Sequence, residues 1–169
     1  MALVTLVLGC SRYAPADTVE DVAASREQVR AAAAEDLVAL ADALGGTIVA
    51  ARGRYNSGGD GMVNRQQYQA GVDIDGPTTT TDQVVAALEA LQYDVAQEPD
   101  SDDSSLPVVG ERDGLRLGVY AGEPPIRASI SGPYLTIPME DGPPPPAEES
   151  LDLPGFGTLP LRLPFEAEG

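Results

Sequence analysis

The 169-residue chain contains no histidine, no lysine and no tryptophan, and it has a single cysteine. Without histidine, it lacks the commonest general base at neutral pH and the commonest metal ligand in proteins. The same absences exclude zinc sites built from cysteine and histidine. We can assign no nucleophile with a neighbouring base, so we expect neither an enzyme nor a bound metal or cofactor.

Positive charge is also scarce. Ten arginines stand against 27 aspartate and glutamate residues, which leaves a formal net charge of −17. Such an acidic surface repels phosphate backbones, so nucleic acid is not expected as a partner. Anionic lipid headgroups repel it too, and a membrane-tethered form would stand off the bilayer. Beyond residue 10, no apolar run approaches the roughly 20 residues that a membrane-spanning helix needs.

The only cysteine, Cys10, follows the apolar and small residues Leu6-Val7-Leu8-Gly9. This arrangement resembles a bacterial lipobox, in which the chain is cut before the cysteine and the thiol becomes a lipid thioether. Lipidation would also account for an unpaired thiol in an exported chain. Cys10 is therefore the candidate lipidation site, with residues 1–9 as a short signal peptide and residues 10–16 as a tether.

Two features of this segment depart from a typical signal peptide. No arginine or lysine precedes Cys10, and the apolar stretch Ala2–Leu8 is at the short end of the roughly 7–15 residues expected. A start site assigned too far downstream would produce both departures. The alternative is a soluble cytoplasmic interaction domain in which Ala2–Leu8 is a buried strand and Cys10 is an inert small hydrophobic residue.

Two amphipathic helices are predicted further along the chain. Asp17 and Glu20 have the spacing of a capping box, and Gly45-Gly46 ends the first helix. The second helix begins near Thr80 or Thr81, where Gln83 completes another capping box. The apolar stripes are Val22, Val29, Ala33, Leu37, Leu40 and Leu44 in the first helix, and Val84, Val85, Leu88 and Leu91 in the second.

Segments of alternating polarity predict the strands. Thr47–Tyr55 and Gln66–Asp75 form a hairpin around a glycine-rich loop, and Asp113-Gly114 joins a second hairpin from Val108 to Tyr120. A further strand surrounds Ile126, Ala128 and Ile130, and residues 93–97 are expected to be extended. In the strand that ends at Asp75, one face is formed by Tyr68, Ala70, Val72 and Ile74.

The expected order of elements is αββαβββ. Alternating strands imply an antiparallel sheet with one wet face, and the two helices would cover the other face. We therefore expect an α+β two-layer sandwich of four to five strands over residues 17–137. Residues 138–169 are rich in proline and acid and are interpreted as a disordered tail. Within that tail, Pro143–Pro146 is either a spacer or a polyproline II ligand.

Several short motifs resemble those of small actinobacterial lipoproteins of unassigned function. They are the lipobox cysteine, a first helix ending in Leu-Gly-Gly-Thr, Ala51-Arg52-Gly53-Arg54-Tyr55, Arg112-Asp113-Gly114-Leu115 and Ser131-Gly132-Pro133. The resemblance covers about residues 10–137 and implies an envelope location but no reaction. Such proteins often carry a cysteine pair, and the corresponding regions here hold Ser57-Gly58 and Tyr134 instead.

The wet face of the sheet is the main candidate site. If Val49, Ala51 and Tyr55 point inward, then Arg52 and Arg54 point outward. The polar residues beside them on the next strand are Gln67 and Gln69.

The later strands add to the same face, because alternation directs Arg116 and Tyr120, and then Arg127 and Ser129, outward. A face carrying Arg52, Arg54, Arg116 and Arg127 suits an anionic or carboxylate-bearing partner. The alternative is a solvated face on which the arginines pair with local acids.

Two acidic groups are weaker candidates. Asp73 and Asp75 lie two residues apart, as paired catalytic carboxylates can, or are simply exposed acids before a turn. The acids between residues 98 and 103 either gather Ca²⁺ or form a solvated loop, and they lack the glycine turn and the distal glutamate of an EF-hand. These four acids are Glu98, Asp100, Asp102 and Asp103.

Together these observations predict a cell-envelope lipoprotein, anchored on the extracytoplasmic side of the membrane, with a non-catalytic binding or structural role. Its expected partners are the membrane, reached through the lipid on Cys10, and a protein or other component of the envelope.

Overall fold

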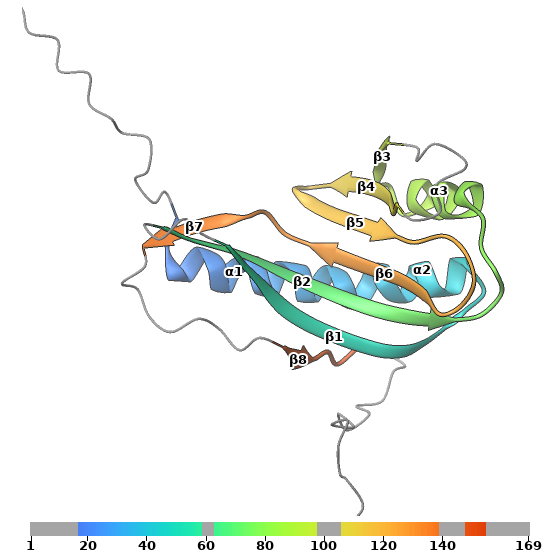
Figure 1. The fold of residues 1–169 in the computed structure, drawn as a ribbon, viewed down its shortest axis with the longest axis horizontal. Helices are drawn as coiled ribbons and strands as arrows, with labels where there is room; N and C mark the ends of the chain where they lie inside the picture. Colours follow the sequence, from blue (N-terminus) through green and yellow to red (C-terminus); the bar gives the residue numbers. More distant parts are fainter. Residues whose placement is uncertain (1–16, 59–62, 98–105, 139–147, 155–169) are drawn as a thin grey trace, which may run out of the picture.

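The computed structural model describes residues 17–58, 63–97, 106–138 and 148–154. Over these residues the chain is α+β, with two helices packed against an open antiparallel sheet of eight strands (Figure 1). The predicted α+β class is confirmed. The sheet has more strands than the four to five expected, because β3 (Asp94–Gln97), β7 (Leu135–Pro138) and β8 (Glu149–Ser150) were not counted as strands.

The first helix has three consecutive parts, and the sheet is ordered β3-β4-β5-β6-β2-β1-β8, with β7 paired to the first part of β2. The helical parts are α1 (Val19–Ala32), the π-helical turn η1 (Ala33–Leu37) and α2 (Val38–Ala43), and the second helix is α3 (Thr81–Ala90). The strands are β1 (Thr47–Gly58), β2 (Val63–Asp75), β3 (Asp94–Gln97), β4 (Val108–Arg112), β5 (Leu115–Val119), β6 (Ile126–Ser131), β7 (Leu135–Pro138) and β8 (Glu149–Ser150).

The capping box of α1 lies one residue later than predicted. Thr18 is the N-cap, and its backbone N–H donates to Asp21 Oδ2 at 2.8 Å. Asp17 instead accepts a hydrogen bond from the backbone N–H of Thr136 at 2.7 Å, which ties the start of the helix to β7. Asp17 and Thr18 are both good N-caps, so the sequence alone could not show which one begins the helix. The contact of Asp17 with Thr136 leaves Thr18 as the N-cap. At α3 the predicted box is confirmed, with Thr80 as N-cap and Gln83 as its partner.

The core lies between the helices and one face of the sheet. The predicted inward face of β2 is buried, and so is the stripe of the first helix. Burying a leucine or isoleucine side chain of this kind stabilises the fold by about 1.5–3 kcal/mol. The largest fully buried side chains are Tyr68, Leu37, Leu40, Ile74, Leu88, Leu117 and Ile130.

An ion pair between a buried aspartate and a partly buried arginine joins η1 to β4. Asp36 is only 3% exposed, and its Oδ2 accepts hydrogen bonds from Tyr93 Oη at 2.7 Å and from Arg112 Nη2 at 2.6 Å. Arg112 also donates to the carbonyl of Leu91 at 2.7 Å. Burial, together with the hydrogen bond to Asp36, raises the pKa of Tyr93. The π-helical turn therefore places a charged group inside the core with its partners satisfied.

A β-bulge near the start of β1 corrects one predicted facing. The pairing of β1 with β2 shifts between Ile48 and Ala50, and Val49 is 44% exposed instead of pointing inward. From Ala51 onward the strand alternates as expected, with Arg52 and Arg54 on the face opposite the core. An inserted residue leaves no trace in the polarity pattern, so the sequence could not show it.

The prediction of a disordered tail over residues 138–169 is wrong for residues 148–154. There, β8 pairs with β1 at Arg52 and Gly53, and the side chains of Leu151 and Leu153 are each 3% exposed. Two apolar anchors and one strand contact help to attach this segment, although the average composition around it is polar. Pro138 belongs to β7, so the sheet also extends to the edge of the predicted tail.

Candidate functional site

The sheet face opposite the helices is polar, and we call it the arginine face. All four arginines that the sequence placed outward lie on it, on strands β1, β5 and β6. Arg65 of β2, which the sequence analysis did not single out, lies on the same face because it shares the alternation of Gln69. The arginine face is thus defined by Arg52, Arg54, Arg65, Arg116 and Arg127.

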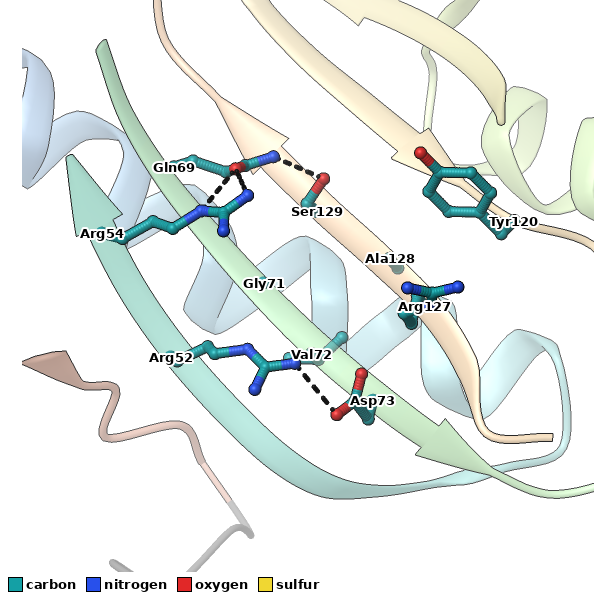
Figure 2. A pocket seen from close by; sticks show the side chains of 10 residues that line it. All are labelled: Arg52, Arg54, Gln69, Gly71, Val72, Asp73, Tyr120, Arg127, Ala128 and Ser129. Atoms are coloured by element: carbon teal, nitrogen blue, oxygen red, sulfur yellow. Dashed lines mark hydrogen bonds and ion pairs between the residues drawn. The ribbon is translucent and has the colours of Figure 1, made fainter. Parts of the chain in front are cut away.

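Three of these arginines surround a depression of about 260 Å³ (Figure 2). Arg52 and Arg54 rise from β1 on one side, and Arg127 rises from β6 on the other. Arg116 does not line it and lies opposite Ser131 in the register. The rest of the lining consists of Gln69, Gly71, Val72, Asp73, Tyr120, Ala128 and Ser129.

Gly71 forms the floor of the depression, between Arg52 on β1 and Ser129 on β6. A Cβ atom at this position would meet only the carbonyl oxygen of Ala128 at 3.6 Å and Ser129 Cβ at 3.8 Å. These are ordinary van der Waals distances, so the sheet itself does not require glycine here. The absent side chain opens the depression without being needed for the fold.

A chain of hydrogen bonds crosses three strands at one end of the depression. Arg54 Nε and Nη2 donate to Gln69 Oε1 at 3.1 and 3.0 Å, and Gln69 Nε2 donates to Ser129 Oγ at 2.9 Å. The amide of Gln69 thereby sets the positions of both Arg54 and Ser129. A side chain restrained in this way loses less conformational entropy when it binds a ligand.

The single carboxylate of the depression belongs to Asp73. Its Oδ2 accepts from Arg52 Nη2 at 3.2 Å, while Asp75 is exposed at the end of β2 opposite Thr47. Asp73 is thus engaged by an arginine, and the pair of free carboxylates considered from the sequence is not assembled. An exposed ion pair such as that with Arg52 contributes about 0–1 kcal/mol.

Arg127 is held differently from the other two arginines. Its guanidinium carbon lies 5.4 Å from the ring centroid of Tyr120, a cation–π distance. Within the described part of the chain it has no carboxylate partner, although Asp73 is opposite it in the register. The depression therefore offers more donors than acceptors and a positive local charge, which suits an anionic group rich in acceptor atoms.

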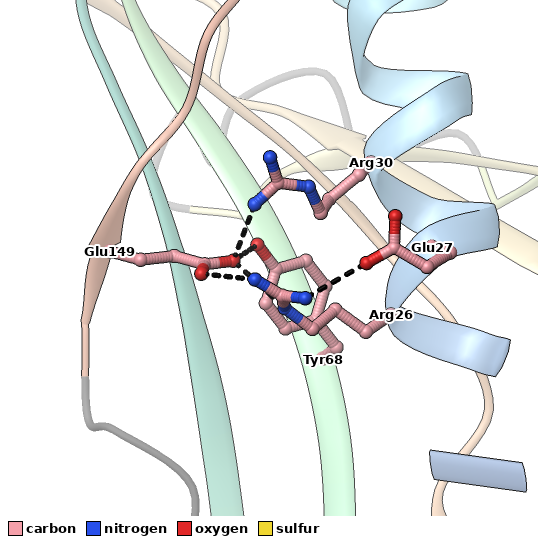
Figure 3. A network of polar contacts seen from close by, with 5 residues as sticks. All are labelled: Arg26, Glu27, Arg30, Tyr68 and Glu149. Atoms are coloured by element: carbon pink, nitrogen blue, oxygen red, sulfur yellow. Dashed lines mark hydrogen bonds and ion pairs between the residues drawn. The ribbon is translucent and has the colours of Figure 1, made fainter. Parts of the chain in front are cut away.

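The sequence analysis missed a polar cluster that holds β8 in place, which we call the Glu149 clamp. The carboxylate of Glu149 accepts from Arg26 Nε at 3.1 Å, from Arg30 Nη1 at 3.0 Å and from the hydroxyl of Tyr68 (Figure 3). These partners lie on α1 and β2, more than 80 residues away in sequence. No local pattern could have revealed this cluster.

The clamp gives Glu149 a low pKa. Partial burial acts to raise the pKa, but the hydrogen bonds from Arg26, Tyr68 and Arg30 outweigh it and lower the pKa to about 2. Burial and the contact with Glu149 in turn raise the pKa of Tyr68. The clamp fixes β8 against β1 beside Arg52, so it supports one wall of the depression.

Comparison of the chain with protein-family models, with curated protein sequences and with solved structures finds no match. In the described ranges, no helix is long and apolar enough to cross a membrane. The same ranges contain no cluster of three or more histidine, cysteine, aspartate or glutamate residues that could hold a metal ion. Cys10, the acids at 98–103 and Pro143–Pro146 lie outside the described residues.

Proposed function

We propose that this protein is a non-catalytic binding protein of the cell envelope. A lipid on Cys10 would anchor it on the extracytoplasmic side of the membrane, and the arginine face would bind an anionic partner. The apolar run before Cys10 and the motifs shared with small actinobacterial lipoproteins support the anchor. The depression on the arginine face supports the binding role.

The contrast between the two faces of the sheet carries the binding proposal. Away from the arginine face, each described arginine is ion-paired: Arg26 and Arg30 with Glu149, and Arg112 with Asp36. On the arginine face, Arg52 alone has a carboxylate partner among the described residues. Acids are plentiful in a chain of net charge −17, yet four of the five arginines of this face have no carboxylate partner among the described residues. Unpaired guanidinium groups held on a rigid sheet favour an external anion as their partner.

The anchor is tested by fractionating cells that express the wild type or Cys10→Ala and measuring the masses of both products. We expect the wild type in the membrane fraction with its N-terminus at a lipid-modified Cys10, and the variant without lipid. A soluble wild type with an intact Met1 would overturn the anchor and support the soluble cytoplasmic domain.

The binding face is tested with a photoreactive phenylalanine derivative, which keeps an aromatic ring, placed in cells at Tyr120, which borders the depression, or at Val19 on α1. The two positions are comparably exposed, at 39% and 44%. We expect a defined adduct from position 120, none from position 19, and loss of the adduct when Arg52 and Arg116 are both changed to Glu. Adducts that survive this charge reversal would contradict the proposal.

A further inference from the structure

We infer that the depression around Gly71 is a carboxylate-binding site, and that its ligand is an acidic side chain in a segment of a partner protein. This inference rests on the proposed function of the arginine face and assigns its ligand. Arg127 supplies the main contact, and the glycine at position 71 makes the room for it.

The hydrogen bonds of the three arginines identify Arg127 as the main contact. Arg54 already uses Nε and Nη2 on Gln69, and Arg52 uses Nη2 on Asp73. Among the described residues, no acceptor takes a hydrogen bond from the guanidinium of Arg127, so both N–H groups of one of its edges can meet a carboxylate. Such bidentate pairs are the strongest form of this interaction. The ring of Tyr120 lies against the same guanidinium and orients it.

The size and shape of the depression favour a side chain over a free small molecule. Its volume of about 260 Å³ is below the roughly 300–1,000 Å³ of typical ligand pockets, and its lining is mainly polar. A free ligand there would stay largely exposed to water. A side chain enters with its own chain packed on the surrounding sheet face, which supplies the remaining contact area.

The charges in the depression suit one or two carboxylates. Three guanidinium groups stand around it and one of them is already matched by Asp73. A phosphate monoester, with about −1.5 to −2 charges, would match the same net charge, so inorganic phosphate is the competitor that the test must include. The face lies on a chain of net charge −17, so attraction acts only at short range, within a Debye length of about 8 Å.

The test uses the full chain carrying Cys10→Ala, labelled with ¹⁵N, and two capped hexapeptides, one of glutamate and one of glutamine. We expect the glutamate peptide to shift the amide signals of Gly71, Arg127 and Ser129 in a saturable way, and the glutamine peptide to leave them unchanged. Arg127→Gln should weaken binding about tenfold or more, as the loss of a charge-assisted pair implies. Arg116→Gln removes the same charge outside the depression and should change affinity less than about twofold.

Two glycines of the arginine face provide a second, steric test. Gly71→Val fills the depression, whereas Gly118→Val adds the same side chain two strands away, where a Cβ would meet only Pro107 Cβ at 3.7 Å. We expect Gly71→Val to abolish the shifts and Gly118→Val to keep them, with both variants folded by their amide spectra. Equal binding by the two valine variants would overturn the site.

The remaining outcomes separate this inference from the proposed function. If Arg127→Gln and Arg116→Gln weaken binding equally, the attraction is diffuse. The site around Gly71 is then wrong, while the binding role of the arginine face stands. If the peptide does not bind but the adduct at position 120 depends on the arginines, the ligand is not a carboxylate and only the inference fails. Inorganic phosphate that displaces the peptide at equal concentration would also overturn the carboxylate assignment. Failure of both experiments overturns both proposals.

Discussion

The hydroxyl of Tyr68 occupies the place that a side chain at position 53 would need. A Cβ atom on Gly53 would overlap Tyr68 Oη, far inside van der Waals contact. Gly53 lies between the two arginines of β1 and is opposite Glu149 in the pairing of β1 with β8. The glycine between Arg52 and Arg54 therefore allows Tyr68 to reach the Glu149 clamp.

Gly53→Ala should destabilise the protein by about 2–4 kcal/mol, because the added methyl group must displace Tyr68 from Glu149. Urea denaturation measures the change. Gly118→Ala is the matched control, since its Cβ would meet only Pro107 Cβ at 3.7 Å. Its midpoint should equal or exceed that of the wild type. Equal midpoints for the two alanine variants would show that Tyr68 moves aside at no cost.

Glu149→Gln should loosen the attachment of β8 and cost about 2–3 kcal/mol, because Arg26 and Arg30 lose their shared anion. Amide hydrogen exchange over residues 149–153 measures the loosening directly. Glu148→Gln removes an equal charge from an exposed neighbour and should leave exchange in this segment unchanged. Protection that persists in Glu149→Gln would mean that the leucines alone hold this segment.

The contribution of the Glu149 clamp to stability should depend on pH. Although burial opposes the change, Arg26, Tyr68 and Arg30 lower the pKa of Glu149 from 4.5 to about 2 in the folded protein. The folded state therefore binds this proton less readily than the unfolded chain does. The resulting stabilisation, about 3 kcal/mol, is fully present above pH 4.5 and is lost as the pH falls towards 2.

The measurement is the free energy of unfolding of the wild type minus that of Glu149→Gln, taken by urea denaturation between pH 6 and pH 2. The subtraction removes the contributions of the other acids, including the relief of their mutual repulsion at low pH. We expect this difference to shrink by about 3 kcal/mol over the range. A difference that stays constant would show that the clamp does not lower the pKa of Glu149.

The facings of the strands were predictable because strand alternation has a fixed period of two. Arg116 and Arg127 each sit between buried neighbours, Arg52 and Arg54 flank the buried Gly53, and this alternation survives in the sheet. Val49 escaped prediction because a bulge shifts the register by one residue without changing the polarity pattern. The sequence therefore predicted the regular alternation of the strands, but it did not predict the bulge at Val49.

The tertiary contacts were beyond local reasoning. Glu149 lies 119 residues from Arg30 and 81 from Tyr68, so its role depends on the assembled sheet. The depression could not be foreseen either, since nothing in the sequence shows that Gly71 lies between Arg52 and Ser129. The sequence predicted which arginines point outward, but only the strand pairing shows that Arg52, Arg54 and Arg127 surround one depression.

The ion pair between Asp36 and Arg112 offers a last prediction. Asp36→Asn should cost about 2–3 kcal/mol, because it leaves the partly buried guanidinium of Arg112 without its anion. Asp42→Asn, an exposed aspartate on the same helix, is the control and should shift the urea midpoint only slightly. The double variant Asp36→Asn with Arg112→Met removes both charges and should recover much of the loss, since an apolar replacement of a buried pair is often tolerated. No recovery in the double variant would indicate that the loss comes from the hydrogen bonds that Asp36 makes with Tyr93 and Arg112 makes with Leu91, and not from the unpaired charge.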